Sequence, residues 1–119
     1  MHNFRELRVW KEGIEIAKQV YLLSAIFPKD EKFGLTSQIR RAAVSIPSNI
    51  AEGAGRGSNK EFAHFLNIAL GSAYELETQL ILTQEFGFII NVELAPLLEK
   101  LILLQRRISS FKTAILSKQ

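Results

Sequence analysis

The polar residues with the most chemical potential in this chain follow one another at one-turn spacing. Gln38, Arg41, Ser45, Asn49 and Glu52 recur every three or four positions, so a helix places them on one face. Donor and acceptor side chains at this spacing can hydrogen-bond in series. This polar stripe is interpreted either as a structural network at a helix or subunit interface, or as a contact with a ligand.

Basic side chains offer a second chemistry, the binding of phosphate groups. The sequence around residues 56–60 combines two cations with the start of a helix, where free backbone N–H groups favour anions. Ser58 and Glu61 form a capping box that already occupies two of those donors. The candidate cations for nucleic-acid binding are Arg40, Arg41, Arg56, Lys60, Arg106 and Arg107.

The charge of the 119-residue chain is distributed unevenly although its net value is only +3. Residues 1–60 carry +4, residues 61–99 carry −6, and residues 100–119 carry +5. One interpretation is intramolecular, with an acidic helix packed beside a basic one. The other is a basic surface that binds a polyanion.

Catalytic and metal-binding patterns are missing from the sequence. His2 and His64 lack metal-ligand spacing, and there are no cysteines. Glu75 and Glu77 point about 200° apart on a helix, and no ExxH motif accompanies them. The glycines of residues 53–57 fit no phosphate-loop pattern and are better explained as left-handed helix caps. The sequence therefore predicts a protein that is not an enzyme, with no catalytic residues, metal or cofactor.

Four amphipathic helices must position these residues, and their apolar periodicity predicts them near 7–27, 33–54, 59–87 and 92–116. Pro28 ends the first helix, Gly87 caps the third, and Asn91 is the predicted N-cap of the fourth. Pro47 predicts a kink in the second helix. Short connections make sequential helices antiparallel, so residues 1–119 are expected to form one all-α domain, an up-down-up-down four-helix bundle.

The first predicted helix carries two adjoining apolar stripes, which is more than a monomeric bundle usually covers and favours an oligomer. Trp10 is interpreted as a core anchor, and Gly13 weakens the helix by about 1 kcal/mol relative to alanine unless a neighbour packs closely against it. The chain contains no apolar run near the ~20 residues of a membrane span and no signal-peptide pattern. A cytoplasmic protein with no membrane partner is expected.

The segment of residues 38–53, Gln-Ile-Arg-Arg-Ala-Ala-Val-Ser-Ile-Pro-Ser-Asn-Ile-Ala-Glu-Gly, resembles the signature of the four-helix-bundle proteins encoded in 23S rRNA intervening sequences. Supporting pieces are Leu7 and Trp10, Phe27-Pro28, Glu31 and Leu35, Glu61-Phe62, Ala69-Leu70-Gly71-Ser72 and Glu75-Leu76-Glu77. The resemblance implies a homopentameric bundle without a known reaction, linked to ribosomal RNA by gene location. A related branch, the accessory proteins of diversity-generating retroelements, is similar in fold and works with nucleic acid.

Two functions of different classes follow as hypotheses. The first is a non-enzymatic module that binds RNA or DNA through the candidate cations, since a pentamer would carry about +15 and release counterions from a phosphate backbone. The alternative is a structural or protein-interaction scaffold in which the arginines pair with Glu52, Glu75 and Glu77. Binding of RNA that weakens steeply with salt distinguishes the first hypothesis from the second.

Overall fold

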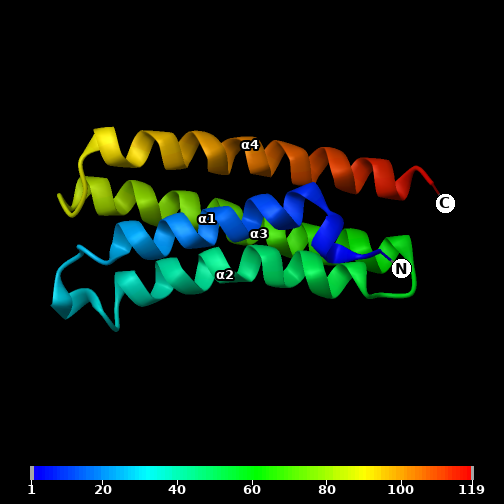
Figure 1. Ribbon diagram of the computed structural model, residues 1–119, viewed down its shortest axis with the longest axis horizontal. Helices are drawn as coiled ribbons and strands as arrows, with labels where there is room; N and C mark the ends of the chain where they lie inside the picture. The colour runs from blue at the N-terminus through cyan, green and yellow to red at the C-terminus, as the bar shows by residue number, and fades with distance from the viewer. Residues whose placement is uncertain (1, 119) are drawn as a thin grey trace.

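Four long helices account for most of residues 2–118, the part of the chain that the computed structural model describes. They are α1 (Arg8–Ser24), α2 (Leu35–Ala54), α3 (Asn59–Glu85) and α4 (Asn91–Leu116), as Figure 1 shows. Two short 3-10 helices, η1 (Phe4–Glu6) and η2 (Lys29–Glu31), precede α1 and α2. No strand occurs between residues 2 and 118, so the predicted all-α fold is confirmed.

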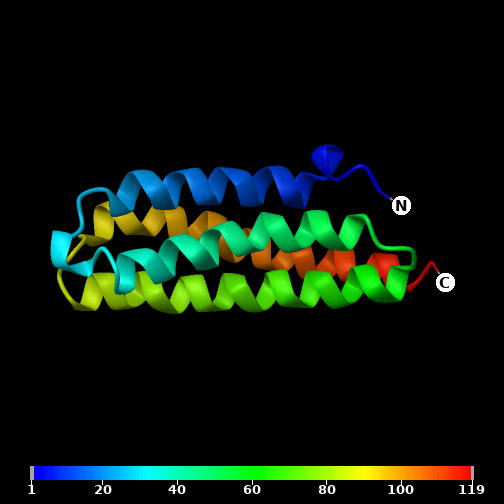
Figure 2. The ribbon, with the colours of Figure 1, turned by 90° about the horizontal axis from the view of Figure 1, so that it is seen from below.

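The four helices form a single elongated bundle of 47 × 24 × 20 Å. Successive helices run in opposite directions along its long axis, joined by short connections at alternating ends (Figures 1 and 2). Each helix packs against its neighbours in sequence, and α1 also contacts α4, which closes the ring of four. The α1–α4 contact is the least extensive of the four helix–helix contacts.

The predicted N-cap Ser58 and the predicted C-terminal cap Gly87 of α3 are confirmed, but only one of the two backbone bonds of the capping box is formed. At its start, the Glu61 amide donates to Ser58 Oγ at 3.1 Å, and that hydroxyl donates to Glu61 Oε1 at 3.2 Å. At its end, Gly87 adopts the left-handed conformation with φ of 79°, and its amide donates to the Gln84 carbonyl at 3.0 Å. The Phe88 amide then reaches back to a carbonyl of the last turn, which completes a Schellman motif.

Two other predicted caps are wrong. Ile90, not Asn91, is the N-cap of α4, and the Asn91 side chain instead accepts a hydrogen bond from Gln84 Nε2 at 3.3 Å. Gly55 ends α2 with φ of −86°, outside the left-handed region, and Gly87 is the one glycine of the described chain with positive φ. Glycine is therefore required near the end of α2 for a reason other than backbone conformation.

That reason is the close approach of α3 to α2 at Gly53. A Cβ atom built on Gly53 would lie 2.7 Å from Phe65 Cβ and 2.9 Å from Phe62 Cδ1, which is closer than real Cβ contacts. A milder version occurs between α1 and α2, where a Cβ on Gly13 would lie 3.4 Å from Pro47. An alanine at position 13 would thus make ordinary van der Waals contact with Pro47, and α2 continues through Pro47 without a break.

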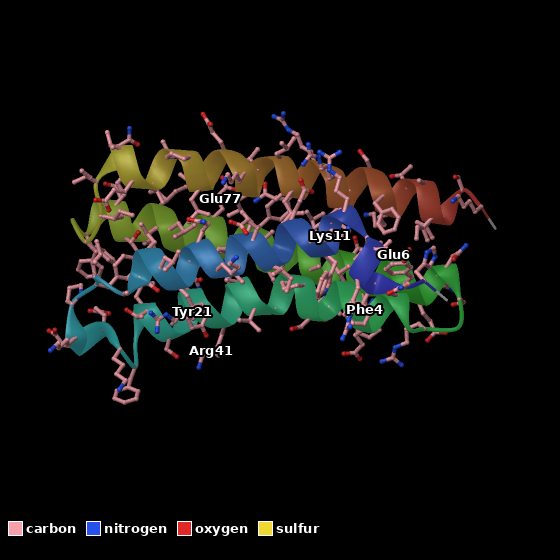
Figure 3. All side chains as sticks on the ribbon, viewed as in Figure 1. Phe4, Glu6, Lys11, Tyr21, Arg41 and Glu77 are labelled. Atoms are coloured by element: carbon pink, nitrogen blue, oxygen red, sulfur yellow. The ribbon has the colours of Figure 1, made fainter. Side chains whose placement is uncertain are left out.

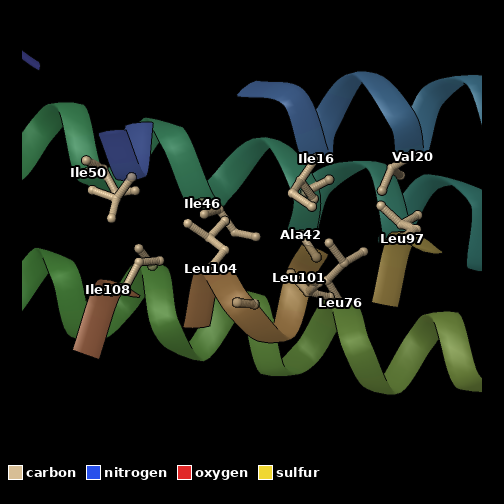
Figure 4. Packing of buried hydrophobic residues seen from close by; sticks show 14 of the residues in the cluster. Ile16, Val20, Ala42, Ile46, Ile50, Leu76, Leu97, Leu101, Leu104 and Ile108 are labelled. Atoms are coloured by element: carbon tan, nitrogen blue, oxygen red, sulfur yellow. The ribbon is translucent and has the colours of Figure 1, made fainter. Parts of the chain in front are cut away.

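Buried aliphatic side chains from all four helices fill the interior of the bundle (Figure 4). They lie at the three- and four-residue spacing that the sequence shows, so the same periodicity that predicts the helices also fills the core. Trp10 is only half-buried and packs against the edge of this core, with its ring 5.2 Å from that of Phe4. Core residues drawn in Figure 4 include Ile16, Val20, Ala42, Ile46, Ile50, Leu76, Leu97, Leu101, Leu104 and Ile108.

Candidate nucleic-acid interface

The middle of the polar stripe lies at the contact between α2 and α3. Ser45 Oγ and Ser72 Oγ are 2.8 Å apart across the two helices. Asn49 Nδ2 donates to Ser45 Oγ at 2.9 Å and to the Ser45 carbonyl at 2.8 Å. These three half-buried side chains therefore form a small hydrogen-bonded network, as the structural interpretation of the stripe expects.

The two ends of the polar stripe do not join this network. Glu52 is exposed and forms an ion pair of 2.6 Å with Arg56, one turn further along the chain. Gln38 and Arg41 are exposed, and with Ala42, Ser45 and Glu75 they line an open hollow of about 370 Å³. The structure thus divides the stripe into an interhelical network, a local ion pair and an open surface.

Three of the six candidate cations are engaged within the chain. Arg40 donates to Ser24 Oγ at 2.9 Å, and its guanidinium lies 4.5 Å from the centre of the Tyr21 ring. Arg56 pairs with Glu52 and stands 4.7 Å from the centre of the Phe65 ring. The third engaged cation, Arg107, forms an ion pair with a carboxylate on another helix.

Arg107 on α4 forms an ion pair with Glu12 on α1, and both side chains are partly buried. The same carboxylate oxygen of Glu12 lies 3.6 Å from Arg8, so two cations share one carboxylate. Nearby, the pKa of Glu15 is lowered because its carboxylate accepts a hydrogen bond from Gln19 and lies beside Lys18. These charges stabilise the contact between α1 and α4, where helix packing is least extensive.

The other three candidate cations, Arg41, Lys60 and Arg106, are exposed and have no ion pair within residues 2–118. They lie on α2, at the start of α3 and on α4, and α2 and α4 are not adjacent helices in the bundle, so the three cations do not form one patch on a single chain. Of the three carboxylates that were predicted to pair with these arginines, Glu52, Glu75 and Glu77, only Glu52 does so within residues 2–118, with Arg56. Glu77 instead accepts a hydrogen bond from Gln105 Nε2 at 2.8 Å.

Several surface hollows of the described chain are lined by basic residues, and two of them combine arginines with an aromatic side chain and no carboxylate. The first, here called the aromatic–basic hollow, has a volume of about 580 Å³ and lies between α1, the η2 connection and α2. The second, the α1–α4 hollow, has a volume of about 360 Å³. The aromatic–basic hollow is lined by Tyr21, Lys32, Phe33, Thr36, Ser37, Arg40, Arg41, Val44 and Ser45. The α1–α4 hollow is lined by Leu7, Arg8, Val9, Arg106, Arg107, Ser110 and Phe111.

Sequence reasoning predicted four of the five arginines that line the two hollows, Arg40, Arg41, Arg106 and Arg107, but not the other residues that line them. Tyr21, Lys32 and Phe33 were not predicted as site residues, and neither was Arg8. The available signal was Lys32-Phe33 in a connection, where a large aromatic residue has no helix face to bury.

Among residues 2–118, no cluster of three His, Asp or Glu side chains could bind a metal ion. None of the described helices is long and apolar enough to cross a membrane.

The structure defines a small four-helix bundle whose basic groups are spread over its surface. The chain belongs to the 23S rRNA-intervening sequence protein family, whose model matches residues 5–110. The fold is similar to the crystal structure of a protein of unknown function from the S23 ribosomal protein family of Bacteroides thetaiotaomicron. The two share 27% identity with a TM-score of 0.79, over 87% of this chain and 97% of the other. No curated protein matches the chain.

Proposed function

We propose that this protein is a non-enzymatic, oligomeric four-helix bundle that binds nucleic acid, with RNA as the favoured ligand. The observation that carries the proposal is the set of exposed, unpaired cations Arg41, Lys60 and Arg106. Cations without a carboxylate partner can exchange their counterions for phosphate, and the released ions drive binding. The predicted similarity to accessory proteins of diversity-generating retroelements points to the same class of ligand.

Assembly would strengthen such binding. The chain carries a net charge of +3, so the predicted homopentamer would carry about +15 and would present each exposed cation five times. Exposed apolar side chains support the formation of subunit contacts, because a monomer rarely leaves so many in water. Several of them lie in or beside the connections that end α1 and α3, including Leu22, Ile26, Phe86, Ile90 and Val92.

A second candidate function is a structural or protein-interaction scaffold that binds no nucleic acid. The observation that favours it is the engagement of Arg40, Arg56 and Arg107 by groups of the same chain. An arginine that already pairs with a carboxylate has less free energy to gain from a phosphate. The exposed apolar side chains would then contact a protein partner.

Titration of RNA at two salt concentrations tests the proposal. We expect the wild type to bind at low salt and to weaken steeply as salt rises. The triple variant Arg41→Gln, Lys60→Gln, Arg106→Gln should bind more weakly and with a shallower salt dependence. A matched control replaces three other exposed lysines with glutamine, Lys11, Lys100 and Lys118, and therefore lowers the net charge equally.

The outcomes separate the two functions. Weaker binding of the first variant than of the control supports a specific basic surface. Equal losses would show that only net charge matters, and absence of wild-type binding at low salt would support the scaffold. Light scattering on the same samples measures the oligomeric state, and a stable monomer at micromolar concentration would contradict the predicted homopentamer.

A further inference from the structure

The aromatic–basic hollow combines two kinds of side chain that recognise different parts of a nucleotide. Three cations line it, Lys32, Arg40 and Arg41, and no carboxylate does. Tyr21 and Arg41, labelled in Figure 3, lie on the same side of the bundle on the adjacent helices α1 and α2. At about 580 Å³, the hollow is within the size range of small-ligand sites.

Its aromatic rings are unusually exposed for their type. Phe33 is 89% exposed, the largest exposed fraction among the big apolar residues of the described chain, and Tyr21 is 47% exposed. A phenyl ring in water contributes no packing energy, so the fold itself does not require Phe33. The Lys32 ammonium lies 5.5 Å from the centre of the Phe33 ring, which places a positive charge beside this exposed surface.

The second ring is held in place by its neighbours. Arg40 lies over Tyr21 at 4.5 Å, and Arg40 is fixed in turn by its 2.9 Å hydrogen bond to Ser24 Oγ. Ser24 is buried, so this arrangement is anchored in the α1–α2 contact. Because the ring and the guanidinium are positioned before any ligand arrives, less side-chain freedom is lost on binding.

We propose that the aromatic–basic hollow binds single-stranded RNA, with unpaired bases stacked on Phe33 and Tyr21 and phosphates held by Lys32 and Arg41. This inference rests on the proposed function and assigns it to one place on the chain. Exposed aromatic rings within a basic groove are the means by which proteins hold single strands without reading their sequence. Bases of a duplex are already stacked on one another, so they cannot use these rings.

The α1–α4 hollow does not offer the same combination. Arg8 and Arg107 share the Glu12 carboxylate, which leaves Arg106 as its unpaired cation. Its aromatic residue, Phe111, is half-buried and packs edge-to-face on Phe62, with the two ring centres 5.6 Å apart. That hollow could attract phosphate, but it presents no ring for a base.

The test measures binding of a labelled single-stranded RNA oligonucleotide and of the duplex of the same sequence. Phe33→Leu should weaken single-strand binding on the order of tenfold and leave duplex binding unchanged, since one stacked base is lost. Its control is Tyr74→Leu, at another exposed aromatic residue, 53% exposed on α3 and outside both basic hollows, which should change neither. Arg41→Gln should weaken binding of both RNAs and lower the salt slope by about 1.

Failure of this inference differs from failure of the proposed function. If the wild type binds neither RNA at low salt, both fall together. If it binds RNA and Phe33→Leu binds the single strand as tightly as Tyr74→Leu does, the hollow is not the binding site, although the proposed function stands. If Phe33→Leu instead dissociates the assembly, as light scattering would show, Phe33 belongs to a subunit contact and the inference is refuted. Circular dichroism of each variant confirms that the bundle is intact.

Discussion

Replacing Gly53 with alanine should destabilise the bundle although Gly53 lies inside a helix. An added Cβ would lie 2.7 Å from Phe65 Cβ, an atom attached directly to the backbone of α3. No rotation of the Phe65 side chain can move that atom, so α3 itself must shift away from α2. The surrounding core is buried, and a displaced helix disturbs its packing along the contact.

Two opposing effects set the size of the change. Alanine favours a helix interior over glycine by about 1 kcal/mol, which stabilises the variant. Overpacking a tight contact costs about 1–3 kcal/mol, which destabilises it. Because the added atom would meet the backbone-attached Phe65 Cβ, we expect a steric cost of about 2–3 kcal/mol, and the free energy of unfolding should fall by about 1–2 kcal/mol. For a chain of this length, that change lowers Tm by about 4–8 °C.

Gly71→Ala supplies the matched control. Gly71 lies in the interior of α3, is exposed, and has no atom within 4 Å of an added Cβ. It should therefore show the helix-propensity effect alone and gain about 0.5–1 kcal/mol. Urea denaturation followed by circular dichroism measures both variants, at equal protein concentration because assembly contributes to apparent stability. A Gly53→Ala variant as stable as wild type would refute the packing argument.

Four further substitutions, used in three experiments, test other contacts. Asn49→Ala removes the donor to Ser45 in the α2–α3 network and should lower the free energy of unfolding by about 1 kcal/mol in urea denaturation. Unchanged stability and assembly would contradict a structural role. Glu12→Gln and Arg107→Gln should show a coupling of about 1 kcal/mol in a double-mutant cycle, because the pair is partly buried with both side chains 28% exposed. Additive effects would show that the pair contributes nothing. Thr36→Val should stabilise the chain by about 1 kcal/mol, because Thr36 Oγ1 is buried without a hydrogen-bond partner; a lower Tm would argue against this.

Helix number and extent could be predicted because they depend on local information. Apolar spacing determines which residues form the core-facing side, and Ser58 and Gly87 mark the ends of α3 by their own backbone and side-chain chemistry. The explanation for Gly53 could not be predicted, since it depends on how closely Phe65 approaches from another helix. Periodicity shows which face of a helix is buried but not the distance to its neighbour.

The candidate site was predicted less completely for the same physical reason. One-turn spacing places Ser45, Asn49 and Glu52 on one face of α2. Ser45 nevertheless hydrogen-bonds to Ser72 on α3, 27 residues along the chain, whereas Glu52 pairs with Arg56 one turn further along the chain. Whether a cation is available for phosphate depends on contacts between distant segments. Arg107 meets a carboxylate 95 residues earlier in the chain, and neighbouring Arg106 has none.

The limited contact between α1 and α4 leads us to expect a definite order of local opening in the native bundle. α2 and α3 each contact both of their neighbours more extensively, whereas α1 is held by α2 on one side and by the weaker α4 contact on the other. Local unfolding begins where few apolar contacts are lost, so α1 should detach while α2, α3 and α4 remain packed. Amide hydrogens in α1 should then exchange with solvent faster than those in the buried turns of α3. A subunit or ligand that bridges α1 and α4 would slow this exchange without altering any single helix.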